Sequence, residues 1–125
     1  MKKHIIWLFI LFSSLLIAQN NSDLIFKESI YSVEIKIEDG KDYLELDKEN
    51  KIQIVTKNID PVNLACTGRN LRRGNFSNST NNTTNWIATV SNEGIKDEKY
   101  SLTIRFKGKK GKYFYHQFLL PVKQN

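Results

Sequence analysis

The feature of this sequence that most constrains its fold is a repeated alternation of apolar and polar residues. In the clearest case, Tyr100, Leu102, Ile104 and Phe106 alternate with polar side chains. The same pattern runs over residues 31–37, 43–46, 52–56 and 113–120. Successive side chains of a strand point to opposite faces, so this period predicts strands with one buried face. No segment shows a sustained period of about 3.6 residues, which argues against a helical or α/β fold.

Turn-forming residues separate these segments at intervals of about ten residues. Asp39-Gly40, Asp60-Pro61 and Asn92–Gly94 interrupt the alternation, and a Gly- and Lys-rich stretch, 107–112, predicts a hairpin turn. Pro121 lacks a backbone donor and predicts the end of the last strand. Short strands at this spacing predict an all-β fold, an antiparallel Ig-like β-sandwich of about seven strands, with an open barrel as the alternative.

The N-terminus has the composition of a secretory signal peptide. Lys2 and Lys3 form a basic head, an apolar segment covers residues 5–12, and Leu15–Ala18 lead into a polar stretch. The largely apolar part is shorter than the roughly 20 residues that a membrane-spanning helix needs, which leaves an uncleaved anchor as the alternative. We predict a signal peptide over residues 1–18, cleaved after Ala18.

The predicted mature chain, residues 19–125, has the length of a single domain. Within it, residues 75–85 consist almost entirely of Asn, Ser and Thr. Such a segment has too little apolar surface to offset the entropy of ordering, so we predict a mobile polar loop there. The signal peptide predicts an exported protein, periplasmic or secreted, with no stable membrane span after cleavage.

Charge is distributed unevenly along the 125-residue chain, whose formal net charge is +6. Residues 19–60 carry six lysines and ten acidic residues, a net charge of −4, whereas residues 61–125 carry eleven basic and three acidic residues, a net charge of +8. If the fold brings two basic turns together, they form a rim for an anionic partner. The alternative is solvated turns whose lysines discourage edge pairing. The candidate rim consists of Arg69, Arg72, Arg73, Lys107, Lys109, Lys110 and Lys112.

The sequence holds few residues suited to catalysis or metal binding. Cys66 is the only cysteine, and His4 and His116 are the only histidines, which excludes a disulfide within the chain and a four-ligand Cys/His zinc site. Cys66 and His116 both fall on apolar-facing strand positions, where a buried thiol behaves as a small hydrophobe. The sequence contains no nucleophile-elbow, metalloprotease or phosphate-binding motif. We therefore expect no enzyme, no metal site and no cofactor.

One part of the chain resembles a known family. Residues 49–54, Glu-Asn-Lys-Ile-Gln-Ile, and residues 58–64, Asn-Ile-Asp-Pro-Val-Asn-Leu, resemble the start of the Ig-like repeats in the periplasmic part of GldM, the gliding-motility and type IX secretion protein of Bacteroidetes. The resemblance covers residues 44–122. GldM joins several repeats behind a membrane helix, whereas this chain predicts one domain after a signal peptide. The resemblance implies a non-catalytic, Ig-like module facing the cell envelope, and not the motor role.

Together these features predict a module that acts by protein–protein contact in the bacterial cell envelope, with another envelope or secreted protein as its partner. The resemblance adds a relation to type IX secretion or gliding. One alternative is a module that binds glycan, including anionic glycan, through exposed aromatics such as Trp86 and Tyr113; another is a small secreted inhibitor. Aromatics beside lysines also suit nucleic acid. We do not expect nucleic acid, because strand aromatics usually form cross-strand pairs and export removes the protein from it.

Overall fold

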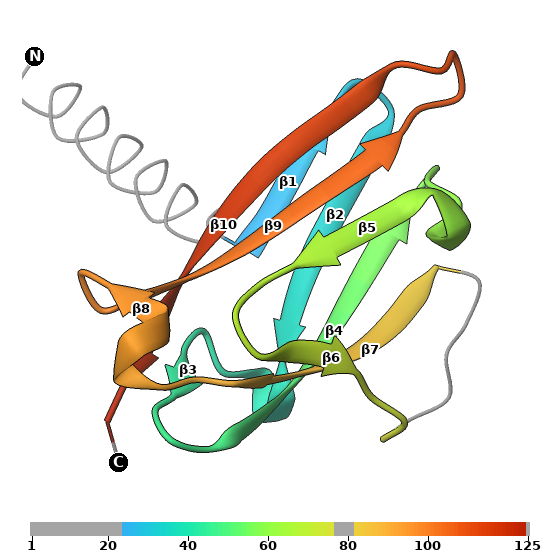
Figure 1. Cartoon of the computed structure of the whole chain (residues 1–125). Coiled ribbons are helices and arrows are strands. Elements are labelled where there is room, and N and C mark those ends of the chain that lie inside the picture. The colour runs from blue at the N-terminus through green and yellow to red at the C-terminus, as the bar shows by residue number, and fades with distance from the viewer. Residues whose placement is uncertain (1–23, 77–81, 125) are drawn as a thin grey trace, which may run out of the picture.

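The computed structural model describes residues 24–76 and 82–124, which form two β-sheets packed face to face (Figure 1). The all-β sandwich predicted from the alternating pattern is confirmed. This is the two-sheet architecture that Ig-like domains share. The predicted signal peptide, residues 1–18, lies outside the described residues. Within the described ranges, no helix has the length and apolar character needed to cross a bilayer.

The first sheet contains five strands in the spatial order β1-β2-β4-β7-β6. Each strand is antiparallel to its neighbours, with Ile35 opposite Ile54 and Ile52 opposite Trp86. Side chains that lie opposite each other share one face, so these residues all point toward the second sheet. The strands are β1 (Ile25–Glu28), β2 (Tyr31–Ile37), β4 (Glu49–Lys57), β6 (Leu71–Arg73) and β7 (Thr83–Thr89).

The second sheet is built on a long antiparallel hairpin and has the order β3-β10-β9-β5, with β8 also paired to β9. Its strands are β3 (Leu44–Glu45), β5 (Leu64–Thr67), β8 (Ile95–Lys96), β9 (Lys99–Lys107) and β10 (Tyr113–Lys123). Three short 3-10 segments lie in the connections: η2 (Glu38–Gly40), η3 (Pro61–Asn63) and η4 (Asn92–Gly94).

Two details of the second sheet differ from the prediction. Pro121 does not end β10: it lies opposite Lys99, and the next amide, Val122 N–H, donates to Glu98 O at 3.0 Å. β3 runs parallel to β10, so the sandwich is not antiparallel throughout. The described part of the chain contains ten strands, where about seven were predicted, because several of the strands at the sheet edges are short.

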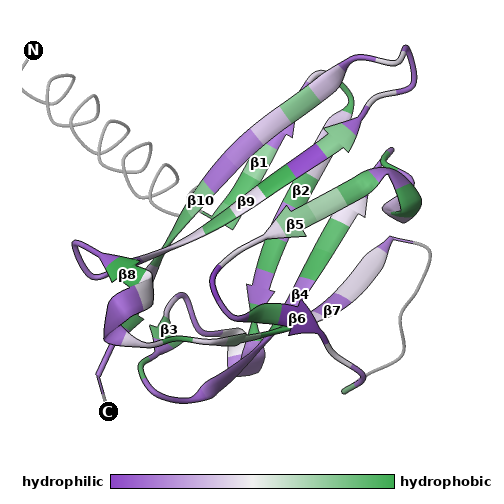
Figure 2. Cartoon of the chain, viewed as in Figure 1, coloured by the Kyte–Doolittle hydropathy of each residue, from purple (hydrophilic) through white to green (hydrophobic). Residues whose placement is uncertain are grey.

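The core lies between the sheets and consists of the apolar members of the alternating segments. Leu102, Ile104 and Phe106 of β9 are fully buried and belong to one cluster with Val33 and Ile54 of the first sheet. Figure 2 shows the same alternation of apolar and polar residues along the strands. Burying one large aliphatic side chain stabilises the fold by about 2 kcal/mol, so the alternation itself provides most of the attraction between the sheets.

The loop that was predicted over the polar residues 75–85 is shorter than expected. Residues 77–81 lie outside the described residues, but β7 begins at Thr83, and both Thr84 and Asn85 are buried. Pairing with β4 satisfies the backbone of this polar sequence. The sequence predicts a strand over residues 86–90, which covers the later part of β7, but composition does not predict its start at residues 83–85, because the partner that orders them lies far away along the chain.

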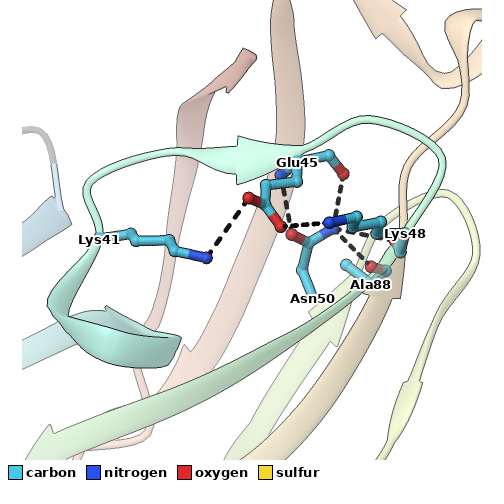
Figure 3. A network of polar contacts seen from close by, with 5 residues as sticks. All are labelled: Lys41, Glu45, Lys48, Asn50 and Ala88. Atoms are coloured by element: carbon cyan, nitrogen blue, oxygen red, sulfur yellow. Dashed lines mark hydrogen bonds and ion pairs between the residues drawn. The ribbon is translucent and has the colours of Figure 1, made fainter. Parts of the chain in front are cut away.

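A buried asparagine ties the turn between β3 and β4 to β7 (Figure 3). Asn50 accepts a hydrogen bond from Glu45 N–H at 2.8 Å, and its Nδ2 donates to the carbonyl oxygens of Glu45, Lys48 and Ala88 at 3.0, 3.1 and 3.1 Å. The Glu45 carboxylate also pairs with Lys41 and Lys48, at 3.5 and 3.6 Å. A buried amide with this many partners fixes the turn in one geometry.

Candidate interaction surface

The basic turn, residues 107–112, closes the β9–β10 hairpin and is anchored to the first sheet. Gly111 has a φ of +84°, which glycine adopts without strain, and its N–H donates to Gly108 O at 3.0 Å. Lys109 N–H donates to the Tyr31 hydroxyl at 2.7 Å. A Cβ at Gly108 would lie 2.8 Å from the same hydroxyl oxygen, so this close approach requires glycine. The sequence therefore holds the lysines on a defined turn.

The lysines of the basic turn have no carboxylate partner in the described part of the chain. Lys107 Nζ lies 6.0 Å from the centre of the Tyr113 ring, and Lys112 Nζ lies 5.4 Å from that of Phe114. Every ion pair formed among residues 24–76 and 82–124 involves other residues. The charge of this turn is therefore available to an anionic partner. All four lysines are exposed: Lys107, Lys109, Lys110 and Lys112.

The three arginines of the predicted rim interact with other groups of the fold. Arg69 pairs with Glu93 at 3.4 Å, and Arg72 pairs with Glu49 at 2.8 Å. The Arg73 guanidinium lies 5.1 Å from the centre of the Trp86 ring. Exposed ion pairs add little stability, but they neutralise charge locally. The arginines are thus weaker candidates for anion binding than the lysines.

The structure does not bring the arginines and the basic turn together. Tyr100, near the start of β9, donates its hydroxyl to Arg69 O at 2.8 Å, whereas Lys107 is the last residue of the same strand. At about 3.4 Å per residue, Tyr100 and Lys107 lie roughly 24 Å apart. Arg72 and Arg73 belong to β6, at an edge of the other sheet (Figure 1). The seven cations therefore do not form one rim.

Two exposed apolar side chains lie in turns beside the basic turn. Ile30, 53% exposed, precedes Tyr31, whose hydroxyl binds the basic turn. Val62, 89% exposed, lies in η3. The connection that contains η3 is held to the β1–β2 turn by Asn58, whose Nδ2 donates to Ile30 O at 2.7 Å. Figure 1 shows these turns at the same end of the sandwich, which we call the hairpin end.

The outward-facing side of β9 and β10 carries exposed aromatic and basic side chains. Tyr113 and Tyr115 are 55% and 66% exposed, and Leu119 is 50% exposed. The Arg105 guanidinium lies 5.6 Å from the centre of the Tyr113 ring. The sequence has no Asp or Glu after Glu98, so neither strand contributes a carboxylate to this face. The charges that these two strands contribute to the face are therefore all positive, and they lie at Lys99, Arg105, Lys107 and Lys123.

A shallow groove of about 250 Å³ lies across the same side of the second sheet. Tyr115, Arg105 and Ala65 lie opposite one another in a row across β10, β9 and β5, and Thr103 and Thr67 form part of the next row. Small side chains thus lie beside two large ones, which creates the hollow. The groove is lined by Ala65, Thr67, Thr103, Ile104, Arg105 and Tyr115.

A larger hollow, of about 660 Å³, lies on the outer side of the first sheet over β2 and β4. Its charged lining is mixed, and Lys51 pairs with Glu38 at 3.9 Å. Neighbouring charges of opposite sign neutralise each other, so this hollow favours neither anions nor cations. Its charged residues are Glu34, Lys36, Glu38, Asp39, Lys41 and Lys51.

Cys66 and His116 do not form a catalytic pair. They lie on opposite sides of Ile104, in β5 and β10, so their backbones are about 10 Å apart. His116 instead stacks on Phe26, with ring centres 4.4 Å apart. Burial raises the pKa of the Cys66 thiol to about 12, against a smaller opposing effect of Arg73, and a protonated thiol is a poor nucleophile. No metal-binding group of three or more side chains occurs among the described residues.

Arg105, Tyr115 and Leu119 were not among the candidate binding residues predicted from the sequence, although the alternation already places Arg105 on the outward side of its strand. The signal was present in the alternation, because Tyr115 and Leu119 occupy the positions of β10 that point away from the core. Large apolar residues at outward positions are a departure from the usual pattern of a half-buried strand. Of the two aromatics proposed for glycan contact, Tyr113 is exposed, whereas Trp86 is half-buried.

Comparison with protein-family models, with curated proteins and with solved structures gives no match for this chain. The chemistry of its surface is therefore the basis for assigning a function.

Proposed function

We propose that this protein is a non-catalytic, exported module that acts by protein–protein contact in the bacterial cell envelope, and that the hairpin end forms the contact. One observation carries the proposal. The basic turn is anchored to the first sheet, and its four lysines have no carboxylate partner among the described residues. The signal peptide predicted from the sequence of residues 1–18 supports the location.

The chemistry of the hairpin end suits a protein partner with an acidic and partly apolar patch. Ile30 and Val62 offer apolar contact beside the lysines. Protein interfaces combine an apolar centre with a polar rim, and complementary charge accelerates association and selects the partner. The resemblance to the GldM repeats supports an envelope setting, with type IX secretion or gliding as the proposed context.

A charge-reversal experiment tests this proposal. In the test variant, Lys109, Lys110 and Lys112 are replaced by Glu, and partner capture is measured by pull-down from envelope extracts of the producing organism. We expect capture to be lost, because the surface becomes acidic and repels an acidic partner.

The matched control makes the same change in net charge far from the hairpin end. Lys36, Lys96 and Lys99 are exposed and form no ion pair with another described residue. Their replacement by Glu places four carboxylates in succession over residues 96–99, so thermal unfolding of the control verifies its fold before capture is measured. We expect the control to capture the partner as the unaltered protein does. Equal capture by both triple variants would contradict the proposal.

A further inference from the structure

We infer that the groove across β5, β9 and β10 is a second binding site, which takes a carboxylated sugar of an anionic glycan. The groove is separate from the hairpin end and goes beyond the proposed protein contact. Its lining includes the exposed aromatic Tyr115, two threonines, Thr67 and Thr103, and Arg105, whose guanidinium lies 5.6 Å from the centre of the Tyr113 ring.

The arrangement of these side chains follows from the register of the sheet. Tyr115 lies opposite Arg105, Arg105 lies opposite Ala65, and Thr103 lies opposite Thr67. Neighbouring strands are about 4.8 Å apart and successive outward residues about 6.8 Å apart, so these groups enclose an area of roughly one sugar ring. The small side chain of Ala65 leaves space beside the larger Arg105 and Tyr115.

Each feature of the groove matches one part of a carboxylated sugar. The apolar face of a pyranose ring packs on an aromatic ring such as that of Tyr115. The hydroxyls of Thr67 and Thr103 can donate and accept hydrogen bonds with ring hydroxyls. The Arg105 guanidinium presents parallel N–H donors that fit both oxygens of a carboxylate.

Charge complementarity favours an anionic ligand over a neutral one. Arg105 has no carboxylate partner among the described residues, and neither β9 nor β10 contains an acidic residue. The outward side chains of β9 add further positive charge with Lys107 and Lys99. A polymer of acidic sugars would therefore be attracted along the whole face, and repeated weak contacts would add up.

The position of the groove favours a sugar over an extended peptide. A peptide that adds to a sheet pairs with the backbone of an edge strand. The groove instead lies on the outer face of the second sheet and spans three strands, and its lining includes the outward side chains of Ala65, Thr103 and Tyr115. A sugar ring, which packs one face on an aromatic side chain and forms hydrogen bonds through the hydroxyls at its edge, suits such a surface.

Titration with three small probes tests the inference. Trigalacturonate carries both rings and carboxylates, its fully methyl-esterified form keeps the rings without the charge, and triglutamate keeps the charge without the rings. We expect trigalacturonate to bind in calorimetry at physiological salt, and the other two to bind at least tenfold more weakly. Equal binding of triglutamate, which would indicate an acidic peptide site, or no binding of trigalacturonate at millimolar concentration, would overturn the inference.

Four variants locate the site. Tyr115→Ala, which removes the stacking ring, and Arg105→Gln, which removes the charge-assisted contact, should each weaken trigalacturonate binding by roughly tenfold. Tyr115→Phe keeps the ring and should bind more tightly than Tyr115→Ala, whereas Lys36→Gln removes one charge from the opposite sheet and should bind normally. Unchanged binding by Tyr115→Ala would overturn the inference. Partner capture is measured in the same Tyr115→Ala protein, where intact capture with lost sugar binding separates this site from the hairpin end.

Discussion

Asn50 is the residue whose side chain has the largest structural role outside the apolar core. It is 6% exposed, and its amide links the β3–β4 turn to Ala88 of β7. Replacing it with Ala leaves the amide of Glu45 and several carbonyls without their partner. We expect Asn50→Ala to lower the free energy of unfolding by about 2–3 kcal/mol, measured by urea denaturation.

The control for this prediction is an asparagine that has no such role. Asn63 is exposed and uses only its backbone, whose N–H donates to Asp60 O at 2.8 Å. Asn63→Ala should change the free energy of unfolding by less than about 0.5 kcal/mol. If both variants lose the same stability, the Asn50 contacts contribute nothing specific.

His116 gives the protein a stability that depends on pH. Its ring lies between Phe26 and Phe118, with ring centres 4.4 and 4.6 Å away, and burial lowers the pKa of the imidazole below its ordinary value of 6.5. The unfolded chain therefore binds a proton at a higher pH than the folded chain does. The contribution of His116 is full above about pH 6.5 and decreases as the pH falls toward the lower pKa of the folded state.

Comparison with His116→Phe isolates this effect, because phenylalanine keeps the ring contacts and does not titrate. We expect the unaltered protein to lose more unfolding free energy between about pH 7.5 and pH 5.5 than the variant does. Urea denaturation at both pH values gives the two differences. The same loss in both proteins would show that His116 is not the titrating group.

At the scale of elements, the basic turn depends on a contact that its own sequence does not contain. The Tyr31 hydroxyl accepts the hydrogen bond from Lys109 N–H. Tyr31→Phe removes only that oxygen, so we expect a loss of about 1 kcal/mol of unfolding free energy and faster hydrogen exchange at the Lys109 amide. Tyr43→Phe serves as the control, since the Tyr43 ring contacts Lys123 and its hydroxyl anchors no turn. Unchanged exchange at Lys109 in Tyr31→Phe would contradict this account.

The strands that the sequence predicts well are those whose burial follows their own alternation. β2 and β9 bury every second residue, and their positions follow directly from the pattern. The start of β7 and the end of β10 depend on distant partners instead. Thr83–Asn85 are ordered by β4, and the chain beyond Pro121 is ordered by β3 and Glu98. Local composition contains no record of such pairing.

The candidate surfaces were predictable to a similar extent. The lysines of the basic turn follow from the Gly and Lys content of residues 107–112. Arg69 does not lie beside them, because it contacts Tyr100 near the start of β9, whereas Lys107 is the last residue of that strand. The sequence of the two turns does not contain this information. The groove depends on register between β5, β9 and β10, and no single segment specifies that register.

At the scale of the whole molecule, much of the excess positive charge of residues 61–125 lies on the β9–β10 hairpin and the basic turn that closes it. The acidic part, residues 19–60, supplies three strands of the first sheet, whereas the strongly basic hairpin supplies the centre of the second. The outer face of the first sheet carries charges of both signs, with Lys51 paired to Glu38, whereas β9 and β10 carry no carboxylate. We expect anion binding to the second sheet to weaken steeply as salt is raised, since exposed charges are screened beyond about 8 Å at physiological ionic strength.

The central claim is that the hairpin end contacts a protein partner, and site-specific photo-crosslinking in living cells tests it most directly. A photoreactive amino acid is placed at Val62, which is 89% exposed at the hairpin end, and separately at the exposed Asn92 in η4, at the other end of the sandwich (Figure 1). We predict a discrete crosslinked partner from position 62, lost when the lysines of the basic turn are replaced by Glu, and none from position 92. A partner crosslinked from position 92 and not from position 62 would contradict the account.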